Sequence, residues 1–307
     1  MTRLYMMIGL PASGKSTIAK EISESEDAVI VSSDEIRREY GDVNDQSQNA
    51  KVFKEVGKRL KENIENGRNV IFDATNVSYK KRRAWLERFN RYNVEKIAIL
   101  VATPYEECLK RNTERDRNVP KEVITRMYHN FYIPQEYEGF DDIQIIYNFS
   151  SINKIKEFYQ LQDLEQDNPH HTLSVKQHCR KAADLINRRK DASESLWLAT
   201  LFHDIGKLKT KTFTNMKGET TEIAHYYNHE KVSAYDSLFM FPIWKRLQPF
   251  ACNYERKEAL YILKLIQWHM IMHFNLSEKT ITKYRKLLGE STWNDLEILH
   301  KADCEAR

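Results

Sequence analysis

The 307-residue sequence has little cysteine and no long apolar run. Its four cysteines, Cys108, Cys179, Cys252 and Cys304, stand far apart and form no CxxC pair, which argues against a disulfide framework and against a cysteine-rich zinc knuckle. No segment approaches the roughly 18 uninterrupted apolar residues of a membrane helix. The first residues also lack the basic region, long apolar core and cleavage site of a signal peptide. We therefore expect a cytoplasmic chain that is neither exported nor membrane-spanning.

Charge of one sign is not in large excess either. The chain has 48 Lys and Arg against 44 Asp and Glu, for a formal net charge of +4. This balance permits a nucleic acid or phosphate partner without requiring one. A hydrophobic content of 41% and a charged content of 30% are typical of a globular protein, and the length is sufficient for two domains.

Residues 1–150 alternate short apolar runs with charged, helix-like segments. The runs predicted to be strands cover residues 4–8, 28–32, 69–74, 96–102 and 143–149. Several are apolar at nearly every position, as expected for strands buried on both faces of a parallel sheet. The segments predicted to be helices cover residues 15–24, 47–66, 79–92, 105–115 and 121–131. Strand alternating with helix predicts an α/β domain, a parallel sheet with flanking helices, over residues 1–150.

The strand signal fades after this first half, and helical periodicity continues to the C-terminus. The polar stretch LQDLEQDNPHHT, residues 161–172, contains an Asn-Pro breaker and is typical of a junction. We therefore predict a linker over residues 151–168 and an all-α domain over residues 169–307.

Glycine is scarce as well, with nine residues in the chain, and two of them fall within one motif. Residues 9–16, GLPASGKS, match GxxxxGK[ST] between a predicted strand and a predicted helix. In this motif the glycines let backbone N–H groups face phosphate oxygens, while Lys15 neutralises the β- and γ-phosphates and Ser16 binds Mg²⁺. The motif predicts ATP, or another nucleoside triphosphate, with Mg²⁺. The predicted nucleotide-binding residues are Gly9, Ser13, Gly14, Lys15, Ser16, Thr17 and Asp73.

Acidic residues follow the second and third predicted strands, at the sheet edge where open α/β folds bind ligands. Asp34 can accept the proton of an attacking hydroxyl, and Arg37, one helical turn later, can hold an acceptor phosphate. The alternative for Asp34 is a helix cap, a common position for aspartate. Asp73 ends the third strand in the segment VIFDATN, and Thr75 and Asn76 reach the same edge.

A pair of arginines follows the fourth predicted strand in the segment CLKRNTERDR, residues 108–117. Arg111 and Arg115 stand four residues apart on a predicted helix, which suits a lid that closes over transferring phosphates. The alternative is a solvated helix face whose charge is balanced by Glu114 and Asp116.

Together these motifs resemble the kinase module of phage-type polynucleotide 5′-hydroxyl kinases, and the resemblance covers residues 1–150. The features that carry it are the P-loop, an Asp followed three residues later by Arg, the segment DATN followed by KKRRAW, and the segment RNTER. The resemblance implies Lys15 and Ser16 for ATP and Mg²⁺, Asp34 as general base, Arg37 at the acceptor, and Arg111 with Arg115 at the donor phosphates.

Two polar residues interrupt the apolar run LATLFHDIGKLKT, residues 198–210. A buried imidazole or carboxylate is costly without a partner, so His203 and Asp204 need one nearby. On a helix their side chains would point about 100° apart and could reach one point beside it. A metal ion there would satisfy both, and this ligand pair suits Fe, Mn, Co, Ni or Zn. Lys207 either touches a phosphate oxygen or is a solvated helix residue.

Further candidate ligands, His178, His229, His269 and Asp303, lie on other predicted helices. The ordered pattern H…HD…H…H…D resembles the HD-domain metal phosphohydrolases over residues 170–307. The resemblance implies that His178, His203, Asp204 and Asp303 hold the principal metal and that His229 and His269 belong to a second. Two metals about 3.5 to 4 Å apart would clamp a phosphate for attack by water. Four histidines that lie close to these ligand positions in the sequence are not assigned as ligands: His170, His171, His225 and His273.

A basic segment could bind a long acceptor. Residues 79–92, YKKRRAWLERFNRY, interleave six cations with four aromatic side chains, a composition that suits single strands. Trp85 and Phe89 are spaced four residues apart, however, and this spacing favours packing in the core.

One module that adds phosphate and one that removes it are typical of nucleic acid end-healing enzymes. The first hypothesis is therefore an ATP-dependent polynucleotide 5′-hydroxyl kinase joined to a phosphohydrolase that acts on 2′,3′-cyclic or 3′ phosphate ends. Its expected partners are nucleic acid ends, RNA favoured over DNA, and a nucleoside triphosphate. One alternative is a nucleoside or small-molecule kinase fused to an HD nucleotidase. Another is a P-loop nucleotide sensor that regulates the HD half. No DxDxT phosphatase motif occurs after residue 150.

Overall fold

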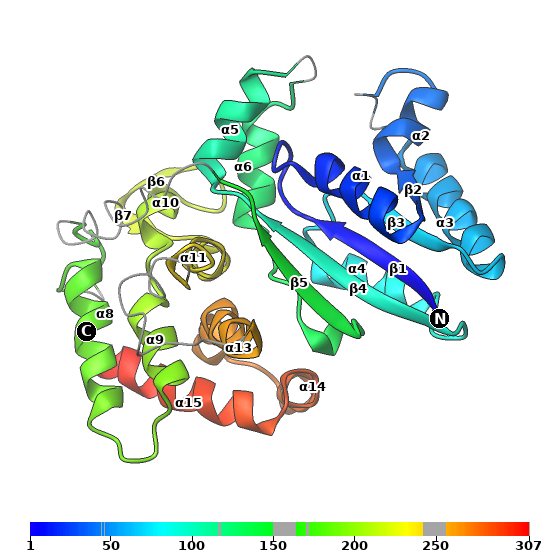
Figure 1. The fold of residues 1–307 in the computed structure, drawn as a ribbon. Helices are drawn as coiled ribbons and strands as arrows, with labels where there is room; N and C mark the ends of the chain where they lie inside the picture. Colours follow the sequence, from blue (N-terminus) through cyan, green and yellow to red (C-terminus); the bar gives the residue numbers. More distant parts are fainter. Residues whose placement is uncertain are drawn as a thin grey trace. The chain divides into compact units, whose positions relative to one another are not determined.

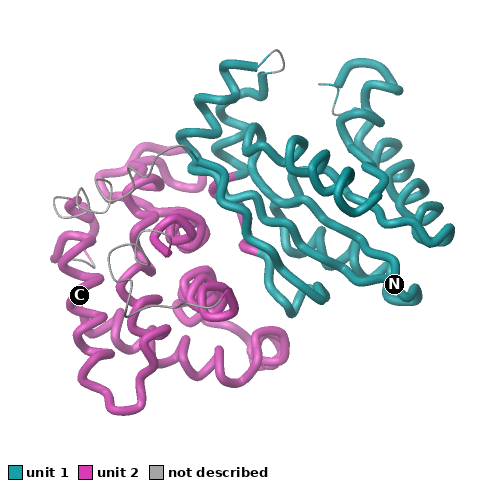
Figure 2. The backbone as a smooth tube through the Cα atoms, viewed as in Figure 1, with its two compact units in different colours: residues 1–127, 134–150 teal, residues 128–133, 151–307 magenta. Residues whose placement is uncertain are grey.

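The computed structural model describes residues 1–43, 45, 47–115, 118–149, 164–169, 172–241 and 256–306, and the chain divides into two compact units (Figure 1, Figure 2). Unit 1 comprises residues 1–127 and 134–150, and unit 2 comprises residues 128–133 and 151–307. Residues 151–163, most of the predicted linker over 151–168, lie outside the described residues.

Unit 1 is built on a five-stranded parallel sheet with the strand order β2-β3-β1-β4-β5. The strands are β1 (Thr2–Ile8), β2 (Ala28–Ser32), β3 (Asn69–Asp73), β4 (Val94–Ala102) and β5 (Asp142–Tyr147). The central strand β1 pairs in parallel with both β3 and β4. The chain leaves β1 towards β2 and β3 and later crosses to β4. The C-terminal end of β1 is therefore the switch point at which open α/β sheets bind ligands.

Helices flank this sheet, with α1 in front of it and α4 behind it in Figure 1. The helices of unit 1 are α1 (Lys15–Glu26), α2 (Ser33–Glu39), α3 (Asn49–Glu65), α4 (Tyr79–Glu87), α5 (Tyr105–Thr113), α6 (Lys121–His129), whose last two residues belong to unit 2, and the 3₁₀ turn η1 (Glu136–Glu138). Helix α3 shows the pattern that drives this packing. Val52, Val56, Leu60 and Ile64 recur every fourth residue and are all buried, so one apolar stripe faces the sheet.

Unit 2 is mainly helical. Its elements in chain order are α8 (Val175–Asn187), α9 (Glu194–Phe202), α10 (Lys207–Thr210), β6 (Thr212–Thr214), β7 (Thr220–His225), α11 (His229–Ser237), α13 (Arg256–Trp268), the 3₁₀ helix η3 (His269–His273), α14 (Glu278–Leu288) and α15 (Glu290–Glu305). The side chains of Ser174 and Ser193 accept backbone N–H bonds at the starts of α8 and α9, as helix N-caps do. Helix α9 packs against α8 and α13, and α15 packs against α8.

The fold class expected from the sequence is confirmed: a parallel sheet with flanking helices is followed by a helical region. Each of the five predicted strands is present, with bounds that differ by no more than two residues. The all-α expectation for the second half missed one feature, the antiparallel pair β6 and β7. Among the residues that the structure describes, no helix has both the length and the apolar character needed to cross a membrane.

Candidate nucleotide site and metal centre

The P-loop connects β1 to α1, and its backbone requires glycine. Gly14 has φ +92°, and a Cβ atom there would lie 2.2 Å from the Nδ2 atom of Asn148. That amide donates a 2.8 Å hydrogen bond to the carbonyl of Ser13, which ties the loop to the segment after β5. A Cβ atom at Gly9 would lie 2.7 Å from the Oγ atom of Ser13. Both glycines therefore let the loop curl tightly before α1, whose N-terminus favours an anion.

Three predicted residues meet at this loop. The buried Lys15 Nζ atom donates to the carbonyl of Leu10 at 2.6 Å. Ser16 Oγ donates to Asp73 Oδ2 at 2.9 Å, across the gap from α1 to the end of β3. Burial lowers the pKa of Lys15 and raises that of Asp73, and the attraction between these two charges opposes both shifts. A hydroxyl and a carboxylate side by side are hard oxygen donors, and they fit the Mg²⁺ that the motif implies.

Asp34 does not cap a helix. Ser32 is the N-cap of α2, where its Oγ atom accepts from the backbone N–H of Glu35 at 3.5 Å, and Asp34 lies in the first turn, half-buried. Its carboxylate charge raises the pKa of both Lys15 and Asp73, as expected of a group at the same sheet edge. The residue expected to act as general base therefore lies close to the residues expected to hold the nucleotide.

Arg37 is buried, which is unusual for a guanidinium. Its Nη1 atom donates to the carbonyl of Asp45 at 3.0 Å. Its Nε atom is also buried and has no hydrogen-bond partner among the described residues. A buried donor in this state is costly, and an acceptor phosphate is one ligand that would satisfy it.

The two lid arginines do not form the expected helical pair. Helix α5 ends at Thr113, so Arg111 lies in its last turn and Arg115 lies beyond it. Arg111 Nη2 bonds to Glu107 Oε1 at 2.6 Å and to the carbonyl of Asn148 at 3.3 Å, which places it beside the P-loop. Arg115 Nη2 bonds to the side-chain oxygen of Asn112 at 2.8 Å. Asp116, one of the expected counter-charges, lies outside the described residues.

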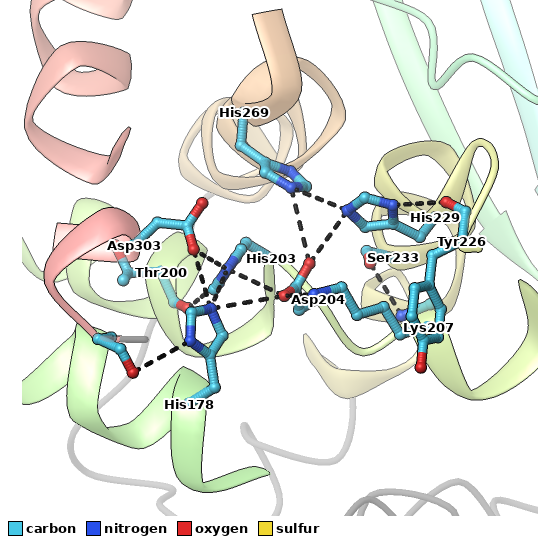
Figure 3. A network of polar contacts seen from close by, with 12 residues as sticks. His178, Thr200, His203, Asp204, Lys207, Tyr226, His229, Ser233, His269 and Asp303 are labelled. Carbon is cyan, nitrogen blue, oxygen red and sulfur yellow. Dashed lines mark hydrogen bonds and ion pairs between the residues drawn. The ribbon is translucent and has the colours of Figure 1, made fainter. Parts of the chain in front are cut away.

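The second site gathers six buried side chains from five places in unit 2 (Figure 3). His178 comes from α8, His229 from the start of α11, His269 from the start of η3, and Asp303 from the last turns of α15. His203 and Asp204 were expected on a helix, but α9 ends at Phe202 and the pair occupies the turn that follows.

A first set of four ligand atoms surrounds one point. His178 Nε2 lies 3.3 Å from His203 Nε2 and 2.9 Å from Asp303 Oδ1. Both imidazole nitrogens lie near Asp204 Oδ2, at 3.5 Å and 3.4 Å, and His203 Nε2 lies 3.6 Å from Asp303 Oδ1. Ligands about 2.1 Å from one metal ion are separated by about 3.0 to 3.4 Å. These atoms are therefore spaced as the ligands of a single cation.

A second set shares Asp204 through its other oxygen. Asp204 Oδ1 lies 3.1 Å from His229 Nε2 and 3.7 Å from His269 Nε2, and the two imidazole nitrogens are 3.2 Å apart. One carboxylate thus faces the first set with Oδ2 and the second set with Oδ1 (Figure 3). This arrangement is what two cations bridged by a carboxylate would require.

The backbone fixes which nitrogen each imidazole presents. The Nδ1 atoms of the four histidines face backbone carbonyls, at 3.4 Å for His178, 2.6 Å for His203, and 2.7 Å for both His229 and His269. A carbonyl can only accept, so Nδ1 donates to it, and Nε2 is the nitrogen that each ring turns towards the cluster. Metal-binding histidines are held by such outer hydrogen bonds. The donor set therefore fits divalent transition metals, as expected from the sequence.

Charges inside this buried cluster stabilise one another. Burial disfavours the ionised Asp204, but the charges of Lys207 and His203 hold the pKa of its carboxyl well below the ordinary value. Burial likewise disfavours the charged His203, and Asp204 nevertheless holds the pKa of that imidazole well above its ordinary value. Since metal ligands bind in deprotonated form, a dication at this point would take the place of a proton.

Lys207 and Gly206 support the turn that carries these ligands. Lys207 is buried, and its Nζ atom lies 2.7 Å from Asp204 Oδ2 and donates to Gln166 Oε1 at 2.7 Å, so the solvated alternative was wrong. The N–H of Gly206 donates to Ser233 Oγ at 2.9 Å. A Cβ atom at Gly206 would lie 2.4 Å from the carbonyl of His229. Only glycine lets the turn approach α11, which supplies His229 of the second set.

Of the unassigned histidines, one belongs beside the site. His273 Nε2 lies 2.8 Å from Asp303 Oδ2, the oxygen that faces away from the first set. Its position four residues after His269 was the signal in the sequence that could have found it. His225 instead bonds to Thr221 and stacks on Tyr227, and His170 and His171 lie outside the described residues.

Comparison with known proteins finds a family match in each half of the chain. Residues 4–134 match the family described as AAA domain, and residues 170–304 match the family described as HD domain. The chain is 33% identical over 136 residues to an L-seryl-tRNA(Sec) kinase of Methanococcus maripaludis, a match that covers 43% of this chain and 53% of the relative. It therefore spans about half the length of this curated relative.

Similar solved structures include a chain of a Pnkp1/Rnl/Hen1 RNA repair complex, with 26% identity over 41% of this chain and 42% of that chain, at a TM-score of 0.38. A gluconokinase from Sinorhizobium meliloti is 13% identical over 48% of this chain and 83% of its own, at a TM-score of 0.36. The first half of the chain is thus similar to an AAA domain and to a kinase relative, and the second half is similar to an HD domain.

Proposed function

We propose that the protein is a bifunctional nucleic acid end-healing enzyme. One half is an ATP-dependent polynucleotide 5′-hydroxyl kinase, and the other removes a 2′,3′-cyclic or 3′ phosphate. The observation that carries the proposal is that one chain holds both a phosphate-donor loop with an adjacent acid and arginine, and a buried His/Asp cluster spaced for two cations. The first arrangement suits transfer of a phosphoryl group to a hydroxyl, and the second suits hydrolysis of a phosphate ester.

In the kinase half each side chain has a distinct task. The P-loop N–H groups and Lys15 bind the donor phosphates, and Ser16 with Asp73 holds Mg²⁺, which neutralises charge on those phosphates. Asp34 takes the proton of the attacking hydroxyl, while Arg37 offers its unpartnered Nε–H to an acceptor phosphate. Arg111, fixed by Glu107 beside the loop, stabilises charge on the transferring group.

A groove in unit 1 supports a polynucleotide as the acceptor. It has a volume of about 550 Å³ and lies between α3 and the chain around the end of α4. Among the residues that line it, five are cationic and none is acidic: Lys54, Lys58, Lys61, Arg88 and Arg91. Phe53, Phe89 and Tyr92 also line it, and aromatic side chains beside cations are the surfaces on which the bases of a single strand stack. Cations around an aromatic floor suit a single strand better than a small neutral acceptor.

Arg82 does not belong to the basic surface that the sequence indicated. Arg82 is fully buried and forms a two-pronged ion pair with Glu138, with both N–O distances at 2.6 Å. It cannot contact a phosphate backbone. Trp85 and Phe89 are also buried, as their helical spacing favoured. The predicted basic surface therefore shifts from α4 alone towards α3, whose lysines the sequence interpretation did not include.

In the HD half, the residues would position a phosphate against two cations. Divalent transition metals supply a Lewis acid and lower the pKa of water, which makes hydrolysis possible at neutral pH. His178, His203, Asp204 and Asp303 would hold the principal metal, and His229 with His269 the second. Lys207 keeps Asp204 ionised and oriented between the two sets.

The curated relative supports RNA as the class of acceptor. Its name states that it phosphorylates a residue carried on a transfer RNA, and the match covers residues of the kinase half. A kinase of this kind adds phosphate to a hydroxyl of a large, negatively charged substrate. This property agrees with the cationic groove and favours RNA ends over a free metabolite.

Two assays test the proposal. In the first, the protein receives radiolabelled ATP together with 5′-hydroxyl RNA, 5′-hydroxyl DNA or free nucleosides. In the second, protein that has been stripped of metal by a chelator receives 2′,3′-cyclic or 3′-phosphate ends after addition of Mn²⁺, Co²⁺, Ni²⁺, Zn²⁺ or Mg²⁺. We expect label on oligonucleotides, RNA first, and hydrolysis with the transition metals. Better turnover of a nucleoside than of any oligonucleotide would replace the proposal with a small-molecule kinase. ATP binding without transfer to any acceptor would favour a nucleotide sensor.

A further inference from the structure

A third group of metal-ligating side chains lies in unit 2 beyond the two sets already described. Its members are His273 at the end of η3 and the pair His300 and Cys304 on α15. Their ligand atoms all lie within 4.8 Å of one another, and all three residues are half-buried. His300 and Cys304 are four residues apart on one helix, so both project from the same face.

Two separations within this group are those of ligands around one ion. His300 Nδ1 lies 3.2 Å from His273 Nε2, and Cys304 Sγ lies 3.8 Å from His300 Nδ1. In a tetrahedral zinc site, Zn–N distances of about 2.0 to 2.1 Å and Zn–S distances of about 2.3 Å separate two nitrogens by about 3.3 Å and a nitrogen from a sulfur by about 3.6 Å. The observed separations agree with both values within a few tenths of an ångström.

Hydrogen bonds alone satisfy these ring nitrogens less completely than a bound cation would. His273 Nε2 lies within reach of both Asp303 Oδ2, at 2.8 Å, and His300 Nδ1, at 3.2 Å. One ring nitrogen has at most one proton, so it cannot donate fully to both neighbours. A cation would accept the lone pairs of both imidazoles, and Asp303 Oδ2 would become a neighbouring oxygen donor.

From this geometry we infer that His273, His300 and Cys304 form an additional binding site for a soft divalent cation, of the zinc type. A thiolate with two imidazoles selects such a cation over Mg²⁺ or Ca²⁺. The cation would tie η3 to α15, the elements that also supply His269 and Asp303. The site stands apart from the proposed function, because the same cation would bind whatever substrate the HD half hydrolyses.

The test measures the absorption spectrum of the Co²⁺-bound full-length protein and the zinc content of the zinc-loaded protein. After removal of bound metal, titration with Co²⁺ should produce a near-ultraviolet thiolate-to-cobalt charge-transfer band. Cys304→Ser should abolish the band, and Cys108→Ser, which alters a buried thiol of unit 1, should leave it. Elemental analysis of zinc-loaded protein should find one equivalent per chain fewer in Cys304→Ser and in His300→Ala than in the wild type, whatever the wild-type total.

Two further measurements keep the inference separate from folding and from hydrolysis. The wild-type protein, treated with iodoacetamide, should be less alkylated at Cys304 when Zn²⁺ is present, as peptide mass spectrometry would show without any variant. His203→Ala, which breaks the first set, should retain the cobalt band. A band that persists in Cys304→Ser, equal zinc content in all variants, or alkylation of Cys304 that Zn²⁺ does not change would each overturn the site.

Discussion

The two candidate sites differ in how the chain assembles them. The nucleotide site is made mostly of neighbours in sequence, since six of its predicted residues fall between Gly9 and Thr17. The metal centre draws single side chains from α8, α11, η3, α15 and the turn after α9, spread from His178 to Asp303. A loop motif therefore specifies the first site locally, whereas the second exists only once unit 2 has folded.

The two candidate sites also differ in how deeply their side chains are buried. Ser16 and Thr17 are exposed and Asp34 is half-buried, which suits a site that a nucleotide and an acceptor must enter and leave. His178, His203 and Asp204 are at most 2% exposed. Bringing such groups out of water is costly unless they are paired, and a resident cation offsets that cost. The exposure of the first site suits exchange of ligands, and the burial of the second would suit retention of a bound cation.

The largest expected effect comes from the residue that both ligand sets share. We expect Asp204→Ala to abolish hydrolysis and to lower the content of both cations, while kinase activity stays within about twofold of the wild type because its residues lie in unit 1. Activity assays and elemental analysis measure this. The matched control is His225→Ala, which alters a histidine of the same unit outside both sets. Hydrolysis that survives in Asp204→Ala would remove the metal centre from the mechanism.

The second prediction concerns the nucleotide site. Asp34→Asn removes the expected proton acceptor without changing size, and a general base contributes about 10² to 10⁴-fold to rate. We expect a loss of kinase kcat in that range with hydrolysis unchanged, and Lys15→Ala should abolish phosphorylation. Glu35→Gln on the same helix is the control. Wild-type phosphorylation by Asp34→Asn would leave Asp34 without a catalytic role.

A third prediction concerns the stability of unit 1. Glu138→Ala leaves the fully buried Arg82 without its carboxylate, and breaking a buried pair in this way costs about 3 to 5 kcal/mol. Glu87→Ala breaks the exposed pair with Arg83, at 3.7 Å, and should cost no more than about 1 kcal/mol. Chemical denaturation followed by Trp fluorescence measures both. Equal costs for the two variants would show that Glu138 is not needed to neutralise Arg82.

The smallest effect tests the groove. With about three phosphate contacts, raising salt from 50 to 200 mM should weaken binding of a 5′-hydroxyl oligonucleotide roughly twentyfold. Lys58→Ala with Arg88→Ala should reduce that change to about threefold, since a single contact remains. Lys20→Ala, an exposed lysine of α1, should leave the salt dependence unchanged. A KM that does not respond to salt would indicate an acceptor without phosphates.

A feature could be predicted from the sequence when the residues that determine it are close together in the chain, and not when they are far apart. The five strands were predicted because each is an apolar run, and the P-loop because glycines at fixed spacing require one backbone path. Asp34 was ambiguous because its role as a cap depended on Ser32, which only the backbone geometry of α2 settles. The burial of Arg82 depends on Glu138, 56 positions later, and no periodicity could reveal that pair. His273 was missed because its partner Asp303 lies 30 positions away on another helix.

The shared carboxylate of Asp204 has a consequence for how the metal centre fills. Two dications that use one ligand are linked thermodynamically: whatever factor the first ion applies to the affinity of the second, the second applies to the first. His203 would have to release its proton to ligate a first ion, and Asp204 Oδ1 would then face the second set beside a carboxylate already bound through Oδ2. Repulsion between the two ions acts in the opposite direction. If both sets hold a cation, a metal titration of the full-length protein should therefore trace coupled sites whose constants depend on one another, rather than a single affinity.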